Sequence, residues 1–327
     1  MKAQSRRKLK GLVKMHKFIL RRLLLLIPVM LGVSFIVFSM LHLAPGDPAV
    51  TAAGEHATLD QIEAMRDAMG LNDPFLVQYG RWLGDVVINQ DLGTSFRTNR
   101  DVVDELTSRF PATLQLAGAA VLVSVVIGLP IGIISATKQY SIFDNVSMFF
   151  ALLGVSMPNF WQGLLLILLF SLNLGWLPFG GLRGGAYNFI DLILPAITLG
   201  TGSAAVVARM TRSSMLEVIR QDYIKTARAK GQTERIITTK HALKNALIPI
   251  ITVVGLSFGF MLGGAVITEI VFTIPGIGSF MVAAIQQRDF PVVQGGVLFV
   301  ALTFTVVNLA VDILYAFVDP RIKSQYR

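Results

Sequence analysis

The sequence predicts an all-α integral membrane protein with six transmembrane helices and a small helical extracytoplasmic cap between the first two. The chain is 53% hydrophobic and only 15% charged, with a mean hydropathy of +0.62, whereas soluble domains carry about 25% charged residues. A helix needs about 20 apolar residues to cross a bilayer core about 30 Å thick. Six runs approach that length: 23–43, 112–134, 145–172, 190–208, 248–272 and 293–317.

The six runs differ in character. The third is long and is interrupted by Pro158, and the fourth is diluted by Gly, Ser and Thr. The first follows basic residues, as the apolar core of a signal peptide does, but it exceeds the usual core length of about 7–15 residues. Pro45 also follows Ala44 directly, which does not suit cleavage. We therefore expect the first run to be a retained membrane anchor.

The distribution of Lys and Arg predicts the orientation. With the N-terminus placed in the cytoplasm and six alternating spans, 22 of the 29 basic residues fall on the cytoplasmic side, nine of them in 1–22 and nine in 209–247. Cytoplasmic loops of membrane proteins carry this excess, so both termini are predicted to be cytoplasmic. The same asymmetry explains the net charge of +9 without a nucleic acid partner. The expected segments are a basic N-terminus (1–22), a first span (23–43), a cap (44–111), a transmembrane domain (112–317) and a tail (318–327).

The cap segment is acidic and helical in pattern. It holds eleven of the 20 Asp and Glu residues. Thr58 and Gln61 have the spacing of a capping box, and Gly70 suits a helix end. A second helix is expected from Pro74. Its apolar face would comprise Phe75, Leu76, Tyr79, Trp82, Leu83, Val86 and Val87.

Several kinds of chemistry have no residues to carry them. The chain has no Cys and only four scattered His, so it offers neither disulfides nor the spacing of a metal site. No Gly-Lys pair occurs, and a phosphate-binding P-loop requires one. We therefore expect no catalytic residue, no metal ligand and no cofactor bound by this chain.

The segment 209–247 is the most informative part of the sequence. It is far longer than a helix connection requires, it is basic, and it has a helical period. Gly231 is placed to end a helix in the left-handed conformation. We interpret the segment as a docking element. The alternative is a basic loop that only enforces topology.

Glycines spaced four apart mark two helix faces. Gly255, Gly259 and Gly263 lie in the fifth run, and Gly128 and Gly132 lie in the second. Small residues at this spacing let helices approach closely in lipid. The triple-glycine face is either a packing surface within this chain or a surface for a partner membrane subunit.

Two carboxylic residues fall within predicted spans, where charges are costly and often functional. Glu269 lies near the outer end of the fifth run, so it either lines a translocation vestibule or caps or pairs locally. Asp312 lies one turn after Asn308 in the sixth run and is expected to bond to a neighbouring helix. We expect neither carboxylate to pair with a Lys or Arg from another span.

Ordered short motifs carry a family resemblance. Tyr223, the Ala227-x3-Gly231 core and the run 245–249 resemble the "EAA" loop of ABC importer permeases, although Lys225 and Thr226 replace the Glu and first Ala. Further matching segments are 43–48, 70–74, 91–95, 109–114, 209–215, 275–278 and 288–295. Together they resemble the first permease subunit of the dipeptide/oligopeptide/nickel type, over about residues 15–325.

The resemblance implies the transmembrane domain of a type I ABC importer in a bacterial inner membrane. It implies a second homologous permease, two ATP-binding subunits that hold ATP and Mg, and an extracytoplasmic substrate-binding protein. A short coupling helix would contact an ATPase through Tyr223, Ala227, Arg228, Ala229, Lys230 and Gly231. The cargo stays open among dipeptides, longer peptides, glutathione, nickel chelates and haem precursors.

Two other classes of membrane protein fit the sequence less well. An ion-coupled secondary transporter acting alone would show internal repeats and mid-membrane charges. The sequence shows no repeat between its halves, and the long segment 209–247 would have no role in such a carrier. An intramembrane metalloprotease needs His-Glu-x2-His, which is absent.

Overall fold

The computed structural model describes residues 2–43, 46–54, 56–181 and 188–318. These residues form α-helices and π-helical segments (η), with one isolated bridge between Thr94 and Asp101. In chain order the elements are α1 Lys2–Leu43, α2 Pro48–Ala53, α3 Leu59–Ala68, α4 Phe75–Gly84, η1 Asp85–Asn89, α5 Val102–Thr137, α6 Ile142–Ser156, α7 Asn159–Leu166, η2 Ile167–Asn173, α8 Phe189–Ile219, α9 Asp222–Ala229, α10 Glu234–Ile236, η4 Ile237–Ala242, α11 Leu243–Gly264, α12 Val266–Val271, α13 Ile277–Gln287 and α14 Phe290–Val318.

The predicted membrane architecture is confirmed. Among the described residues, five helices are long and apolar enough to cross a membrane, and a sixth span is reached if a bent helix pair is taken as one broken span. The five helices cover 22–40 in α1, 102–137 in α5, 189–219 in α8, 234–263 from α10 to α11, and 290–313 in α14. Since about 20 residues cross the bilayer core, the ends of the longer helices extend beyond it, and 234–242 is such an end. The protein is therefore a multi-pass membrane protein.

The interruption at Pro158 is larger than expected. Instead of one straight span, the chain bends by 104° between α6 and the helix formed by α7 and η2. Proline disfavours helical backbone in the residue before it and donates no hydrogen bond itself. Met157 is accordingly extended, with φ −84° and ψ 129°.

Two other helix boundaries differ from the predicted runs. Helix α5 begins ten residues before the predicted span, with the Asp101 carboxylate accepting from Val103 N at its start. The fifth run is divided, because α11 ends at Gly264 and α12 begins at Val266. Glycine is a poor helix former, and Gly263 and Gly264 directly precede this break.

The second and fourth spans are packed through glycines. A Cβ on Gly128 would lie 2.5 Å from Ala204 O, and one on Gly132 would lie 2.6 Å from Ala208 O. The fourth span has such a glycine as well: a Cβ on Gly200 of α8 would lie 2.6 Å from Ala120 O of α5. The small residues that dilute the fourth run therefore allow α5 and α8 to pack backbone against backbone.

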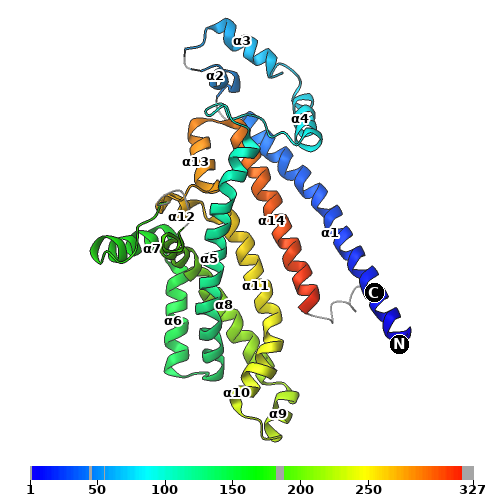
Figure 1. Ribbon diagram of the computed structural model, residues 1–327, viewed down its shortest axis with the longest axis vertical. Helices are drawn as coiled ribbons and strands as arrows, with labels where there is room; N and C mark the ends of the chain where they lie inside the picture. The colour runs from blue at the N-terminus through cyan, green and yellow to red at the C-terminus, as the bar shows by residue number, and fades with distance from the viewer. Residues whose placement is uncertain (1, 44–45, 55, 182–187, 319–327) are drawn as a thin grey trace.

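The two ends of the molecule are different in construction (Figure 1). The cap, formed by α2, α3 and α4, lies at one end, which we label the outer side by the position of the cap, and α9 and α10 lie at the other end. The N-terminal end of α1 and the C-terminal end of α14 both point toward the end that carries α9. The basic segment 209–247 and both ends of the described chain therefore share one side of the helix bundle.

The cap follows most of its predicted pattern. The capping box of Thr58 and Gln61 is formed, and Gly70 ends α3 with φ +64°. Helix α4 packs on α1 through aromatic rings, among them Phe75 against Phe38 at 5.5 Å between centroids. Two members of the predicted apolar face, Leu76 and Val87, are 69% and 67% exposed. Helix α4 contacts α1 along only a narrow face, so these side chains have nothing to cover them.

Candidate functional site

The segment after α8 folds into a short, anchored hairpin, which we call the basic hairpin (residues 220–242). Its central element is the eight-residue helix α9. Ile224 is fully buried in a cluster with Met215, Ile237 and Ala246. This apolar contact fixes α9 to the ends of α8 and α11. The predicted docking element is therefore held by the membrane helices themselves.

Gly231 ends α9 in the conformation expected from the sequence. Its φ is +73°, a region that favours glycine. Gly231 N donates to Arg228 O at 2.9 Å, and Gln232 N donates to Ala227 O at 3.3 Å. This pair of bonds is the Schellman arrangement. It gives the short helix a fixed end.

The predicted coupling residues gather on α9 and its end. Tyr223 is 44% exposed, Ala227 is half-buried against the hairpin core, and the other four are exposed: Arg228, Ala229, Lys230 and Gly231. Asn245 Nδ2 donates to the Tyr223 hydroxyl at 2.8 Å. Two motif segments that are separated in sequence therefore meet at one surface.

Local ion pairs surround this surface. Lys225 Nζ lies 2.9 Å from Asp222 Oδ1, and Arg228 Nε lies 2.7 Å from Glu234 Oε1. Hydrogen bonding to Lys225 lowers the pKa of Asp222, and hydrogen bonding to Arg228 lowers the pKa of Glu234. The partners are solvated, so the pairs orient side chains more than they stabilise the fold.

One buried ion pair ties the third span to the approach to the hairpin. Arg212 donates through Nε and Nη2 to the two Asp144 oxygens, each at 2.8 Å. Asp144 also accepts from Tyr140 N at 3.0 Å and is 1% exposed. The start of α6 is thereby fixed to α8 by a fork-shaped contact.

Glu269 occupies a closed polar site on the outer side of the bundle. It is fully buried, and Thr113 Oγ1 donates to its Oε1 at 2.7 Å. Ser279 N donates to Oε2 at 2.8 Å, so the carboxyl group caps the start of α13. In this structure Glu269 caps locally, which is one of the two predicted roles, and it does not face an open vestibule.

Gly276 and Gly278 explain the motif 275–278. A Cβ on Gly278 would lie 2.9 Å from Glu269 Oε2, and one on Gly276 would collide with the same carboxyl group. Ile277 N, between them, donates to Thr113 Oγ1 at 2.9 Å. The glycines therefore let the backbone close around Glu269.

Asp312 corrects a prediction. Arg22 Nη1 lies 2.9 Å from Asp312 Oδ2, so a cation at the start of the first span pairs with a carboxylate of the sixth. The expectation that Asp312 has no cationic partner from another span was wrong, because the packing of α1 on α14 is a tertiary feature that no local pattern reveals. Asp312 does bond to a neighbouring helix, as expected, but its partner is a cation.

The triple-glycine face packs within the chain. A Cβ on Gly255 would lie 2.5 Å from Val311, and one on Gly259 would lie 3.2 Å from Phe304. A Cβ on Gly263 would lie 3.8 Å from Val300. All three contacts are with α14. The geometry therefore supports intrachain packing, the first of the two predicted roles.

A third buried carboxylate, Asp289, joins two of the motifs. Ser95 Oγ donates to Asp289 Oδ2 at 2.5 Å, and Phe96 N donates to Oδ1 at 3.1 Å. Asp289 is 3% exposed and lies between α13 and α14. The loop before α5 is thus fixed to the outer end of the sixth span.

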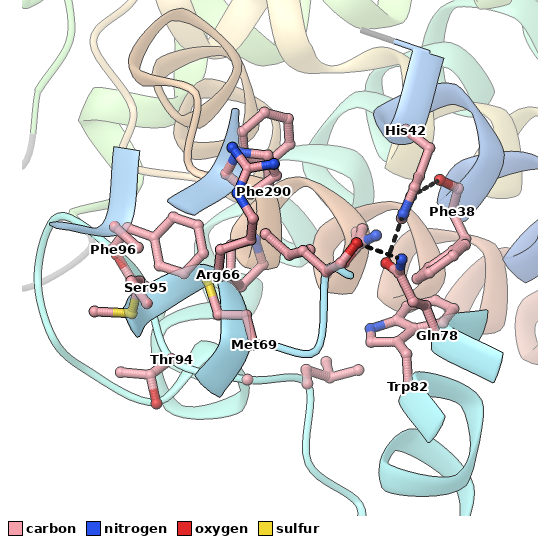
Figure 2. A pocket seen from close by; sticks show the side chains of 18 of the residues that line it. Phe38, His42, Arg66, Met69, Gln78, Trp82, Thr94, Ser95, Phe96 and Phe290 are labelled. Atoms are coloured by element: carbon pink, nitrogen blue, oxygen red, sulfur yellow. Dashed lines mark hydrogen bonds between the residues drawn. The ribbon is translucent and has the colours of Figure 1, made fainter. Parts of the chain in front are cut away.

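A cavity of about 900 Å³ lies between the cap and the outer ends of α1 and α14. Figure 2 shows Phe38, Trp82, Phe96 and Phe290 among its walls, with Arg66 also lining it. His42 Nε2 and Gln78 Oε1 are hydrogen-bonded at 2.8 Å beside the aromatic rings. The space is large, mixed in polarity and placed on the outer side.

Three of these features were not predicted from the sequence. Asp144 and Asp289 each lie outside the apolar core of a span, so they look like ordinary solvated acids in the sequence. Asp289 did stand within a quoted motif, and that was the available signal. The cavity depends on how four short elements are arranged around α1, and no local pattern encodes this.

The sequence relatives agree with the geometry. The family model of the binding-protein-dependent transport system inner membrane component matches residues 128–324, and its N-terminal companion matches 15–117. A dipeptide transport system permease protein of Alkalihalophilus pseudofirmus is 47% identical over 94% of this chain and all of the relative. The dipeptide permease of Escherichia coli K12 is 43% identical over 95% of this chain and all of the relative. A glutathione transport system permease protein of Escherichia coli O6:H1 is also 43% identical, over 94% of this chain and 99% of the relative.

A solved structure supports the fold. An inward-facing form of the MetNI methionine ABC transporter matches with a TM-score of 0.55 at 20% identity, over 66% of this chain and 97% of that chain. At this identity the likeness concerns fold alone. The all-helical bundle is that of a type I ABC importer transmembrane domain. On the family models and these relatives, the chain belongs to the binding-protein-dependent transport system inner membrane component family of ABC importer permeases.

Proposed function

We propose that this chain is the first permease subunit of an ATP-driven importer for short peptides, with both termini and the basic hairpin in the cytoplasm. It forms the translocation pathway with a second permease, receives cargo from an external binding protein and is powered by two separate subunits that bind ATP and Mg. The peptide class rests on relatives whose names specify dipeptide and glutathione transport. Glutathione is itself a tripeptide, so short peptides are what these cargoes share.

One observation carries the coupling role. Helix α9 is anchored by the fully buried Ile224 and ended by a Schellman bond pair at Gly231. Its other face is exposed, with Tyr223 bonded to Asn245 and Arg228 paired with Glu234. A short rigid helix with an exposed face can transmit movement between a soluble subunit and the membrane helices. The residues Tyr223, Ala227 and Arg228–Gly231 are the proposed contact.

Gly231→Arg tests this role. No atom lies within 4 Å of a Cβ built on Gly231, so the new side chain has room, and the φ of +73° is its main local strain. The substituted complex should insert and hydrolyse ATP, but its uptake of labelled dipeptide into vesicles should fall at least tenfold. Gly231→Asn is the matched control, because Asn adopts the left-handed conformation more readily and adds less bulk.

Two results would count against the proposal in different ways. Normal coupled uptake by Gly231→Arg would remove the docking role while leaving the permease assignment intact. The chain lacks Cys, so the single variants Lys225→Cys and Asp60→Cys can each be treated with a membrane-impermeant thiol reagent on intact cells. The proposed orientation predicts labelling of Asp60→Cys only. Labelling at Lys225 and not at Asp60 would reverse the proposed orientation.

A further inference from the structure

A basic cleft, which we call the α6–α8 cleft, opens where the third and fourth spans end on the side of the basic hairpin. It encloses about 590 Å³ and is lined by Met148 from α6 together with Arg209, Arg212, Ser213, Leu216, Glu217 and Arg220 from α8. The positions 209, 213, 216 and 220 recur at i, i+4, i+7 and i+11, so they share one helix face. Together with Arg212, the arginines at 209 and 220 bring three guanidinium groups to this cleft.

The charges of this cleft are incompletely neutralised. Asp144 pairs with Arg212 and cancels its charge. Within the described chain no ion pair is formed by Arg209, Arg220 or Glu217. Two cations against one carboxylate leave the cleft positive, so its ligand should be an anion.

Arg212 is positioned in advance for such a ligand. Its contact with Asp144 uses Nε and Nη2, two of the three nitrogens of a group with five N–H donors. Asp144 is buried, whereas the Arg212 side chain is 25% exposed. The guanidinium is therefore held rigidly with donors left over at the cleft. A planar guanidinium in a fixed position suits phosphate oxygens particularly well.

The cleft also lies at the level of lipid headgroups. The apolar run of α8 ends at Ala208, and Arg209 is the first charged residue after it. A rise of 1.5 Å per residue places Ser213 about 6 Å further along the axis. A headgroup layer is roughly 5–7 Å thick on each side of the hydrocarbon core. Arg209, Arg212 and Ser213 therefore fall within this layer, and Met148 adds an apolar wall.

We propose that the α6–α8 cleft binds a phosphate ester, and that the ester is the headgroup of an anionic phospholipid in the adjoining leaflet. The shared chemistry would also suit a free phosphate. The lipid is favoured because the first arginine adjoins the hydrocarbon core and Met148 offers contact to a glycerol or acyl group. This inference requires only that α8 spans a membrane and does not depend on the cargo.

The test uses the purified importer complex in detergent micelles that contain phosphatidylcholine, and phosphatidylglycerol is added in steps. Bound lipid is counted by native mass spectrometry. Phosphatidylglycerol should bind at least tenfold better than phosphatidylcholine, and Arg209→Gln should weaken its binding about fivefold, as expected for one basic residue near an anionic surface. Arg220→Gln, which lies further from the bilayer, should have a smaller effect. Lys138→Gln is the matched control, because Lys138 is an exposed cation at the end of α5 outside the cleft.

Three outcomes would overturn the proposal. Equal losses for Arg209→Gln and Lys138→Gln would reduce the effect to general surface charge. Equal binding of the two phospholipids would remove the anion preference. Displacement of phosphatidylglycerol by millimolar inorganic phosphate would assign the cleft to a free anion instead of a lipid. Dipeptide uptake by the same variants reports separately on the proposed transport function.

Discussion

The outer side of the molecule and the basic hairpin use charged groups in opposite ways. On the outer side, Glu269 and Asp289 are buried and accept hydrogen bonds from Thr113, Ser95 and Phe96, which lie more than 150 residues away in sequence. In the hairpin, the ion pairs join residues three to six positions apart and are exposed. One region uses charge to fix tertiary structure, and the other leaves charge available to a partner.

This contrast predicts where variants should affect folding and where they should affect function. Removing a buried carboxyl group leaves its donors without acceptors, and those donors are then buried and unsatisfied. Removing an exposed ion pair exposes its partner to water, at little cost. Outer-side variants should therefore destabilise the fold, whereas hairpin variants should act on coupling.

Glu269→Ala should have the largest effect. We expect it to lower the free energy of unfolding by roughly 4 kcal/mol, because two hydrogen bonds and the packing of a fully buried side chain are lost. Glu269→Gln, which keeps the shape and one acceptor, should cost about 1 kcal/mol. Unfolding by SDS in mixed micelles measures both. If Glu269→Ala abolishes uptake without loss of stability, Glu269 acts in the pathway and the structural role is wrong.

Ile224→Ala should come next and should separate stability from coupling. Truncation of a fully buried Ile costs about 3 kcal/mol, but here the cost falls on the anchoring of α9. Amide exchange across 222–229 should accelerate, and uptake per ATP hydrolysed should fall with insertion unchanged. Ile236→Ala is the matched control, since Ile236 in α10 is 40% exposed. Unchanged exchange in α9 would show that the helix has another anchor.

Much of this fold was predictable from the sequence because its signals are local or periodic. The six apolar runs, the capping box at Thr58 and the helix end at Gly231 each depend on neighbouring residues, and the structure contains all of them. The break at Pro158 was also visible, because proline constrains its own backbone and that of the preceding residue.

The remainder of the site was hidden because it depends on tertiary contact. The pairing of Arg22 with Asp312 needs α1 to lie beside α14, and the packing of Gly255 needs Val311 opposite it. Glu269 illustrates the limit most directly. Its residue type and place in a span allowed either a vestibule or a cap, and only the position of Thr113 and Ser279 distinguishes them.

Tyr223→Phe should have a smaller effect than Ile224→Ala. It removes the hydroxyl that accepts from Asn245 Nδ2, while the same nitrogen keeps its bond to His241 O at 3.1 Å. The expected loss is about 1 kcal/mol or less, measured by local amide exchange at the start of α11. If exposed Tyr223 contacts an ATPase as proposed, uptake should fall more than this small loss explains. Equal, slight changes in exchange and uptake would indicate a structural role only.

The smallest effect should come from Glu234→Gln and from its pH dependence. Arg228 lowers the pKa of Glu234 in the folded protein. The pair therefore stabilises the hairpin fully at any pH above the ordinary pKa of a glutamate, which includes neutral pH. The contribution is lost as the pH falls through the lowered pKa, because the folded state then takes up the proton that the unfolded state has already bound. Wild type and Glu234→Gln should therefore converge in hairpin amide protection once the pH lies below the lowered pKa, after correction for intrinsic exchange rates, and differ slightly at pH 7. Because both side chains are solvated, 0.5 M salt should remove the difference at pH 7 as well. A difference that survives this salt would mean that Glu234 and Arg228 form a stronger, desolvated contact than their exposed geometry allows.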